Sequence, residues 1–170
     1  GVLVLGLPLI PASTPAPTVW AHDSGCAWAA AWLTLRDREF LGQREMLSRP
    51  DWAGQLHWRD RNSDKRSGHR PDLIGWANSR ATLIEVELTG KSRGRLDAIL
   101  KMYSPWLCSP EIRALMYICS DHVEMRRIER AARRVGVSLG DLRLELLDTI
   151  KEQTIAAYEA ARTQAKRTAA

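Results

Sequence analysis

The chain has 170 residues, 45% of them hydrophobic, so it is long enough to bury one sizeable core and falls within the size range of a single domain. Its 25 Lys and Arg residues outnumber its 20 Asp and Glu residues, and the resulting formal charge of +5 favours anionic partners such as DNA. The three cysteines are widely spaced and form no CxxC pair, which argues against a disulfide scaffold or a zinc module and favours a reduced, cytoplasmic protein.

The start of the chain predicts an arm rather than part of the domain. Gly1–Ile10 is apolar, but it lacks a basic flank and is too short to span a bilayer, so we expect neither a signal peptide nor membrane association. Pro11–Pro17 is rich in Pro, Ser, Thr and Ala, which is typical of a linker. We therefore divide the chain into an arm or linker at 1–18, a domain at 19–148 and a C-terminal helix at 149–170.

The first predicted helix covers residues 23–36, where Trp28 and Trp32 recur on one face. Asp23 or Ser24 can cap its N-terminus. The alternative is that His22 and Asp23 form a catalytic pair. Adjacent side chains diverge in direction, so we favour the cap.

The segment that follows predicts strands and turns. In order, we expect a short helical turn that contains Glu45, a strand at Gln55–Arg59, a turn-like segment at 61–68, and a hairpin of strands Asp72–Trp76 and Ala81–Leu88. Side chains on a strand alternate between its two faces. Ile84 and Val86 therefore point to the core, and the opposite face carries Glu85 and Glu87.

The second half of the chain predicts alternating helices and strands. We expect a helix at Ser92–Tyr103 that stops before Pro105, a strand at Arg113–Cys119, a helix from Asp121 to Gly136, a strand at Leu142–Leu147, and a helix at Thr149–Lys166. With the first half, this gives the order α-β-β-β-α-β-α-β-α, which predicts an α/β domain around a mixed sheet flanked by helices.

Three carboxylates are candidates for a metal site. If the hairpin strands pair, Asp72 lies beside the face that carries Glu85 and Glu87, so the three can converge on one Mg²⁺ or Mn²⁺ ion. Such an ion can polarise a phosphate and lower the pKa of an attacking water. Without the ion the carboxylates repel one another, so removing Glu85 should relieve strain. The alternative is a merely solvated strand face, and Glu45 is a further acidic residue that could join the site.

The segments "RPDLIGW" (70–76) and "IEVELTGK" (84–91) resemble the motifs of the PD-(D/E)xK nuclease superfamily. The resemblance implies a restriction-endonuclease-like fold and a Mg²⁺-dependent endonuclease in which Asp72, Glu85 and Glu87 hold the ion. The third motif residue of that superfamily is usually Lys, where this chain has Glu87, and some restriction endonucleases with Glu there still cleave. Lys91 lies just beyond the strand and could supply the missing cation as a catalytic residue.

A narrower resemblance is to the replication-relaxation family of plasmid and mobile-element proteins. It rests on His22-Asp23, Arg70-Pro71-Asp72, Glu85-Val86-Glu87, the basic run Lys91–Arg95 and Tyr103, in that order. The winged helix of that family is missing, so residues 1–18 could be its remnant. The resemblance implies a role in plasmid or mobile-element replication or mobilisation, with the proteins of those processes as partners.

Basic residues near the carboxylates are candidates for sequence-independent contact with DNA phosphates. They are Lys91, Arg93, Arg95, His69 and Arg70. The arginines at 126–134 occupy the polar face of one helix, and we expect them to be solvated. Two alternatives stay open: a catalytically inactive member of the fold that binds DNA or a protein, and an interaction module that forms a homodimer through its C-terminal helix.

Overall fold

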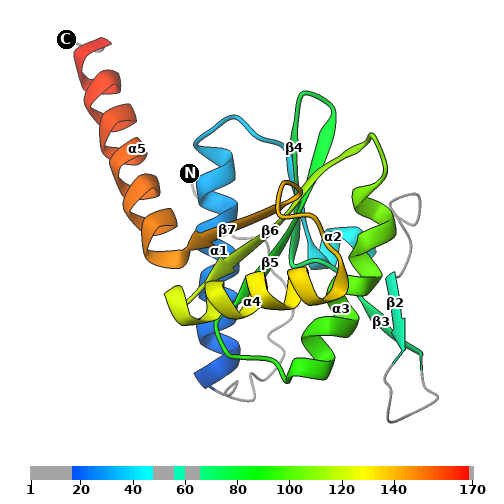
Figure 1. Cartoon of the computed structure of the whole chain (residues 1–170). Coiled ribbons are helices and arrows are strands. Elements are labelled where there is room, and N and C mark those ends of the chain that lie inside the picture. The colour runs from blue at the N-terminus through cyan, green and yellow to red at the C-terminus, as the bar shows by residue number, and fades with distance from the viewer. Residues whose placement is uncertain (1–16, 48–55, 60–65, 169–170) are drawn as a thin grey trace, which may run out of the picture.

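The computed structural model describes residues 17–47, 56–59 and 66–168 (Figure 1). Its helices are α1 (Pro17–Thr34), α2 (Gln43–Leu47), α3 (Arg93–Leu107), α4 (His122–Val135) and α5 (Leu147–Thr168). Its strands are β1 (Phe40–Gly42), β2 (Leu56–Arg59), β3 (Arg66–His69), β4 (Leu73–Ala77), β5 (Arg80–Glu87), β6 (Ile112–Cys119) and β7 (Leu142–Leu146). The predicted α/β class with a mixed sheet is confirmed.

Five of the strands form one sheet in the order β1-β4-β5-β6-β7. The pairs β1–β4 and β4–β5 are antiparallel, whereas β5–β6 and β6–β7 are parallel. The hairpin β4–β5 and the central position of β5 are as predicted. The strand expected at 55–59 instead pairs with β3 in a separate two-stranded ribbon, and the sheet edge is taken by β1, which was not predicted. A three-residue strand is too short to show a period in sequence, so β1 is specified by its pairing with β4.

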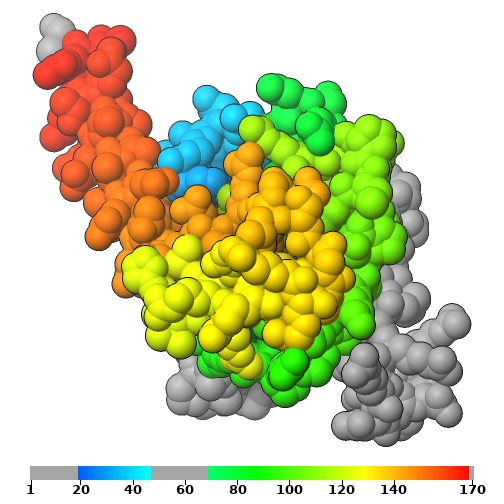
Figure 2. Space-filling view, in the orientation of Figure 1, coloured from blue at the N-terminus to red at the C-terminus, as the bar shows by residue number. Residues whose placement is uncertain are grey.

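Helices cover both faces of the sheet. On one face α3 and α4 pack Leu96, Ile99 and Ile128 against the sheet, and Figure 2 shows α4 lying across this side of the molecule. On the other face α1 and the start of α5 contribute Ala29, Leu33 and Ile150. Both faces of β5 are therefore buried, and the alternative that Glu85 and Glu87 lie on a merely solvated strand face is wrong. The reason is that α3 lies over that face, where Tyr103 of α3, His69 of β3 and Lys91 before α3 pair with the two carboxylates.

The helix α1 begins at Pro17, earlier than predicted. Pro is favoured in the first turn of a helix because its missing N–H would have had no intrahelical partner there. Asp23 consequently lies inside the helix with its side chain 74% exposed, and the prediction that it caps the N-terminus is wrong. The helical region also begins within the segment assigned to an arm, whose residues 1–16 lie outside the described part of the chain.

The helix α3 begins as predicted but ends later. Ser92 is its N-cap, and the Ser92 hydroxyl accepts the Arg95 N–H at 3.4 Å. The helix continues through Pro105 to Leu107, because Pro105 falls in the last turn and its carbonyl accepts the Cys108 N–H at 3.3 Å. The predicted stop before Pro105 is therefore wrong.

Both predicted ends of α4 are confirmed. The Asp121 side chain accepts the N–H groups of Val123 and Glu124 at 2.7 and 2.9 Å. Gly136 closes the helix with a left-handed φ of 81°, a conformation that glycine adopts without a steric penalty. The flanking strands β6 and β7 also lie within one residue of their expected bounds.

The contact between α1 and β5 depends on Gly25. A Cβ at this position would lie 2.8 Å from Val86 Cγ1, a side chain that is itself buried. We expect Gly25→Ala to lower the free energy of unfolding by about 1–2 kcal/mol, because the steric conflict exceeds the helix propensity that alanine gains. The matched control is Gly94→Ala in α3, where nothing lies within 4 Å of the added Cβ. Urea denaturation compares the two, and a Gly25→Ala protein as stable as Gly94→Ala would contradict a close approach of α1 to β5.

The helix α5 extends away from the rest of the molecule beyond its first turns (Figures 1 and 2). Its buried residues are Ile150 and Thr154, whereas Ile155 and Tyr158 are exposed. Within the described residues, no helix has both the length and the apolar character that a membrane span requires.

Candidate functional site

The carboxylates singled out in the sequence lie where β4 begins and β5 ends. Glu85 and Glu87 occupy the face of β5 that α3 covers, and each is 2% exposed. Their cross-strand neighbours on β6 are Tyr117 and Cys119. Burying a carboxylate costs several kcal/mol unless it is paired, so the partners of each one decide how the site is built.

Glu85 is held by two side chains. Its Oε1 accepts a hydrogen bond from the Tyr103 hydroxyl and lies 2.7 Å from His69 Nε2. The His69 and Tyr103 rings meet edge to face, with centroids 5.9 Å apart. Burial, together with the negative charge of Glu85, raises the pKa of Tyr103 well above its ordinary value, so the phenol keeps its proton and donates it. Two elements distant in sequence, β3 and α3, thus position one carboxylate.

Glu87 is paired with Lys91. The Lys91 ammonium forms an ion pair with Glu87 Oε2, and the lysine side chain is 16% exposed. Burial raises the pKa of Glu87, and the hydrogen bond from Lys91 opposes that rise. Lys91 lies in the connection between β5 and α3, four residues after Glu87. Its ammonium therefore reaches back to the Glu87 carboxylate at the end of β5.

Asp72 differs from the two glutamates because it is reachable from solvent, with its side chain 13% exposed. It lies just before β4 and continues the hairpin, since its N–H donates to the Ile84 carbonyl at 2.9 Å. Its Oδ2 accepts the Val86 N–H at 2.8 Å, which places the carboxylate next to the segment that carries Glu85 and Glu87. Asp72 therefore lies at the accessible edge of the buried carboxylates.

The helix α1 brings His22 and Cys26 to Asp72. His22 Nε2 lies 3.3 Å from Asp72 Oδ2, and His22 Nδ1 lies 3.7 Å from Cys26 Sγ. The hydrogen bond with Asp72 raises the pKa of His22 above its ordinary value, whereas burial raises the pKa of the Cys26 thiol. Gly25 allows this approach, because it permits the helix to lie close to Val86.

His22, Cys26 and Asp72 each offer one possible metal-ligand atom, and these three atoms lie within 4.8 Å of one another. No other group of three such residues occurs in the described parts of the chain. Donor atoms bound to one ion at about 2.0–2.3 Å lie at most roughly 4.6 Å apart. Asp72, Glu85 and Glu87 do not form such a group, and Glu85 and Glu87 are instead paired with His69, Tyr103 and Lys91. A nitrogen, sulfur and oxygen donor set suits a transition ion better than Mg²⁺, which prefers oxygen.

Sequence reasoning missed His22 and Cys26 as partners of Asp72. The signal was present as His-x₃-Cys, a spacing that places both side chains on one face of a helix. The spacing was not recognised as helical because the helix was expected to begin after His22, which would leave His22 outside it.

The remaining candidates have separate roles. His69 holds Glu85 through Nε2, whereas Arg93 and Arg95 are exposed at the start of α3. Arg70 is half-buried. Glu45 accepts the Gly42 N–H at 2.7 Å and is not part of the trio above.

The arrangement offers three chemical functions at one end of the hairpin: an accessible carboxylate, a lysine ammonium, and exposed guanidinium groups on α3. The Tyr117 hydroxyl nearby is buried without a hydrogen-bond partner among the described residues, so one polar group at the site is unsatisfied. Comparisons of the chain with protein-family models, curated proteins and solved structures give no match, so the site is interpreted from its geometry.

Proposed function

We propose that the chain is a DNA-processing domain with a restriction-endonuclease-like fold that hydrolyses phosphodiester bonds with the help of a divalent metal. The observation that carries the proposal is the position of Lys91, whose ammonium pairs with the carboxylate of Glu87. The nuclease motif has a lysine at the position of Glu87, so Lys91 returns a cation to the same place. The order of β4, β5, α3 and the parallel strand β6 also agrees with that fold.

The metal would be held by Asp72, with His22 and Cys26 as further donors. This donor set favours Zn²⁺ over the Mg²⁺ or Mn²⁺ that the motif alone suggests. When bound, such an ion polarises a phosphate and lowers the pKa of a water. Lys91 would neutralise charge on the phosphate, and Arg93 and Arg95 would hold the flanking backbone of the DNA. Glu85, fixed by His69 and Tyr103, would orient the strand end that carries these groups.

The test is the nicking of supercoiled plasmid by the full chain with Mn²⁺, Zn²⁺, Mg²⁺ or EDTA. We expect cleavage with a transition ion, and a loss of about a hundredfold or more in Asp72→Asn, because a metal ligand and a charge are removed together. Asp148→Asn, an exposed carboxylate on α5, is the matched control and should cleave like the parent.

A second readout does not depend on cleavage. A metal that binds only the folded protein stabilises it by about 2.7 kcal/mol at a hundred times its dissociation constant. Zn²⁺ should therefore raise the melting temperature of the parent and of Asp148→Asn, but much less that of Asp72→Asn. Absence of both metal-dependent stabilisation and cleavage would overturn the proposal.

The second candidate is a catalytically inactive member of the same fold that binds DNA. It is favoured by the burial of Glu85 and Glu87, since both already have partners and neither reaches solvent. In this case DNA binding in EDTA persists, weakens steeply with salt, and is reduced by Arg93→Gln with Arg95→Gln. Cleavage is then absent in every metal.

A further inference from the structure

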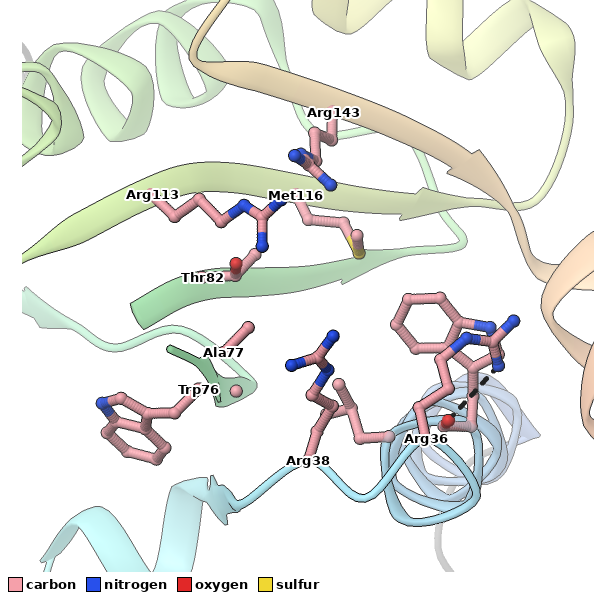
Figure 3. A pocket seen from close by; sticks show the side chains of 11 residues that line it. Arg36, Arg38, Trp76, Ala77, Thr82, Arg113, Met116 and Arg143 are labelled. Carbon is pink, nitrogen blue, oxygen red and sulfur yellow. Dashed lines mark hydrogen bonds between the residues drawn. The ribbon is translucent and has the colours of Figure 1, made fainter. Parts of the chain in front are cut away.

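A second polar site lies at the opposite end of the strands, on the side of the sheet that α1 covers. It is a pocket of about 270 Å³ that opens between the end of α1 and the first residues of β5, β6 and β7. Four arginines line it: Arg36, Arg38, Arg113 and Arg143. Figure 3 shows Arg38, Arg113 and Arg143 reaching into the same space from three different elements.

Irregular backbone aims two of these side chains at the pocket. Between β5 and β6, Ala81 pairs with Ile112 and Thr82 with Ala114, so Arg113 is the extra residue of a β-bulge. A bulge redirects the side chain that it carries. Asp37 has a left-handed φ of 50°, which turns the chain sharply between Arg36 and Arg38.

The charges in the pocket are not neutralised by the protein. Arg38, Arg113 and Arg143 are exposed, and none of their guanidinium groups has a hydrogen bond or an ion pair in the described structure. Arg36 stacks on the Trp32 ring at 4.4 Å from its centroid and donates to Gln153 Oε1 at 2.8 Å, so it too lacks a carboxylate partner. Four like charges around one small space repel one another, and an anion between them removes that repulsion.

The acidic residues near the pocket do not neutralise its arginines. Asp37 and Glu39 flank Arg38 in sequence, yet neither forms an ion pair with a described arginine. The pocket lining itself contains no carboxylate. An arginine presents planar, paired donors that match the oxygens of a phosphate, so phosphate is the anion that this lining recognises best.

We propose that this pocket binds the phosphate monoester of a nucleoside phosphate, either as a free nucleotide or as the phosphorylated end of a nucleic-acid strand. A monoester carries about −1.5 to −2 charges at neutral pH, whereas an internal phosphodiester carries one, so the monoester is the better match to several arginines. The volume lies just below the roughly 300 Å³ at which ligand pockets begin, so it suits one nucleotide at most rather than a large cofactor. Trp32 adds aromatic surface at its wall.

The pocket is separate from the carboxylate site and does not depend on the function proposed for it. Thr82 lines the pocket, whereas Glu87 lies five residues further along the same strand, about 16 Å away at 3.3 Å per residue. Loss of metal-dependent cleavage would therefore leave phosphate binding unchanged, and loss of phosphate binding would leave metal-dependent stabilisation unchanged.

The test is calorimetric titration of the full chain, in EDTA, with thymidine 5′-monophosphate and with thymidine. We expect binding of the monophosphate and none of the nucleoside. Arg113→Gln with Arg143→Gln should weaken binding by at least about tenfold, because two charge-assisted contacts are lost. Arg126→Gln with Arg130→Gln is the matched control: it removes the same charge from exposed positions on α4 and should bind like the parent.

Short oligothymidylate strands with and without a 5′-phosphate distinguish the two sources of the ligand. Preference for the phosphorylated strand over the free nucleotide assigns the pocket to strand ends, and the reverse assigns it to nucleotides. The proposal would be overturned if the pocket and control variants weakened binding of the monophosphate equally. It would also be overturned if the parent bound the monophosphate no more strongly than inorganic sulfate. Circular dichroism of each variant shows that the fold is retained.

Discussion

Replacing Ile84 with aspartate is expected to unfold the protein. Ile84 is 1% exposed at the centre of β5 and packs in the core formed with α1. An aspartate there would be a buried charge without a partner, which costs several kcal/mol against a total stability of about 5–15 kcal/mol. Circular dichroism and the distribution between soluble and aggregated protein report the result.

Two controls separate burial from the substitution itself. Ile84→Val removes one methylene and should cost about 0.5–1.5 kcal/mol while retaining the fold. Ile155→Asp introduces the same charge on α5, where the isoleucine is 47% exposed, and should melt close to the parent. An Ile84→Asp protein that is soluble and melts like the parent would mean that β5 is not the central strand.

The fold was predictable where local sequence and tertiary structure agree. The alternation in β5 and the caps of α4 at Asp121 and Gly136 each specify their element within a few residues. The strand β2 was predicted, but its partner β3 and the edge strand β1 were not, because both are short and depend on pairing. The start of α1 was misplaced because Asp23 is a good cap by type, and residue type alone does not exclude a longer helix.

The sequence indicated where the candidate residues lie along the chain, but it did not indicate their hydrogen-bond and ion-pair partners. The motifs drew attention to the end of the β4–β5 hairpin, and they made Lys91 a candidate to replace the missing cation. The partners of the carboxylates come from α1, β3 and α3, whose approach is decided by packing. The arginine pocket was missed for the same reason, since Arg38, Arg113 and Arg143 are far apart in sequence.

Glu85→Ala is expected to destabilise the protein by about 2–4 kcal/mol, which is opposite in sign to the expectation from charge repulsion alone. The mutation removes the acceptor of the buried Tyr103 hydroxyl and the partner of His69, and it leaves a cavity beneath α3. Repulsion among the carboxylates is small by comparison, because Glu87 is paired with Lys91 and Asp72 accepts the Val86 N–H.

Glu85→Gln separates the hydrogen bonds from the charge. Glutamine keeps an oxygen that can accept from Tyr103 and nearly the same volume, so it should recover at least half of the stability that alanine loses. Glu152→Ala on α5, where the side chain is exposed, controls for loss of a glutamate and should change stability by less than about 0.5 kcal/mol. Urea denaturation of the four proteins measures these differences in the absence of metal. If Glu85→Ala proved more stable than the parent, repulsion between the carboxylates would dominate the metal-free site, and the hydrogen bonds from His69 and Tyr103 would count for little.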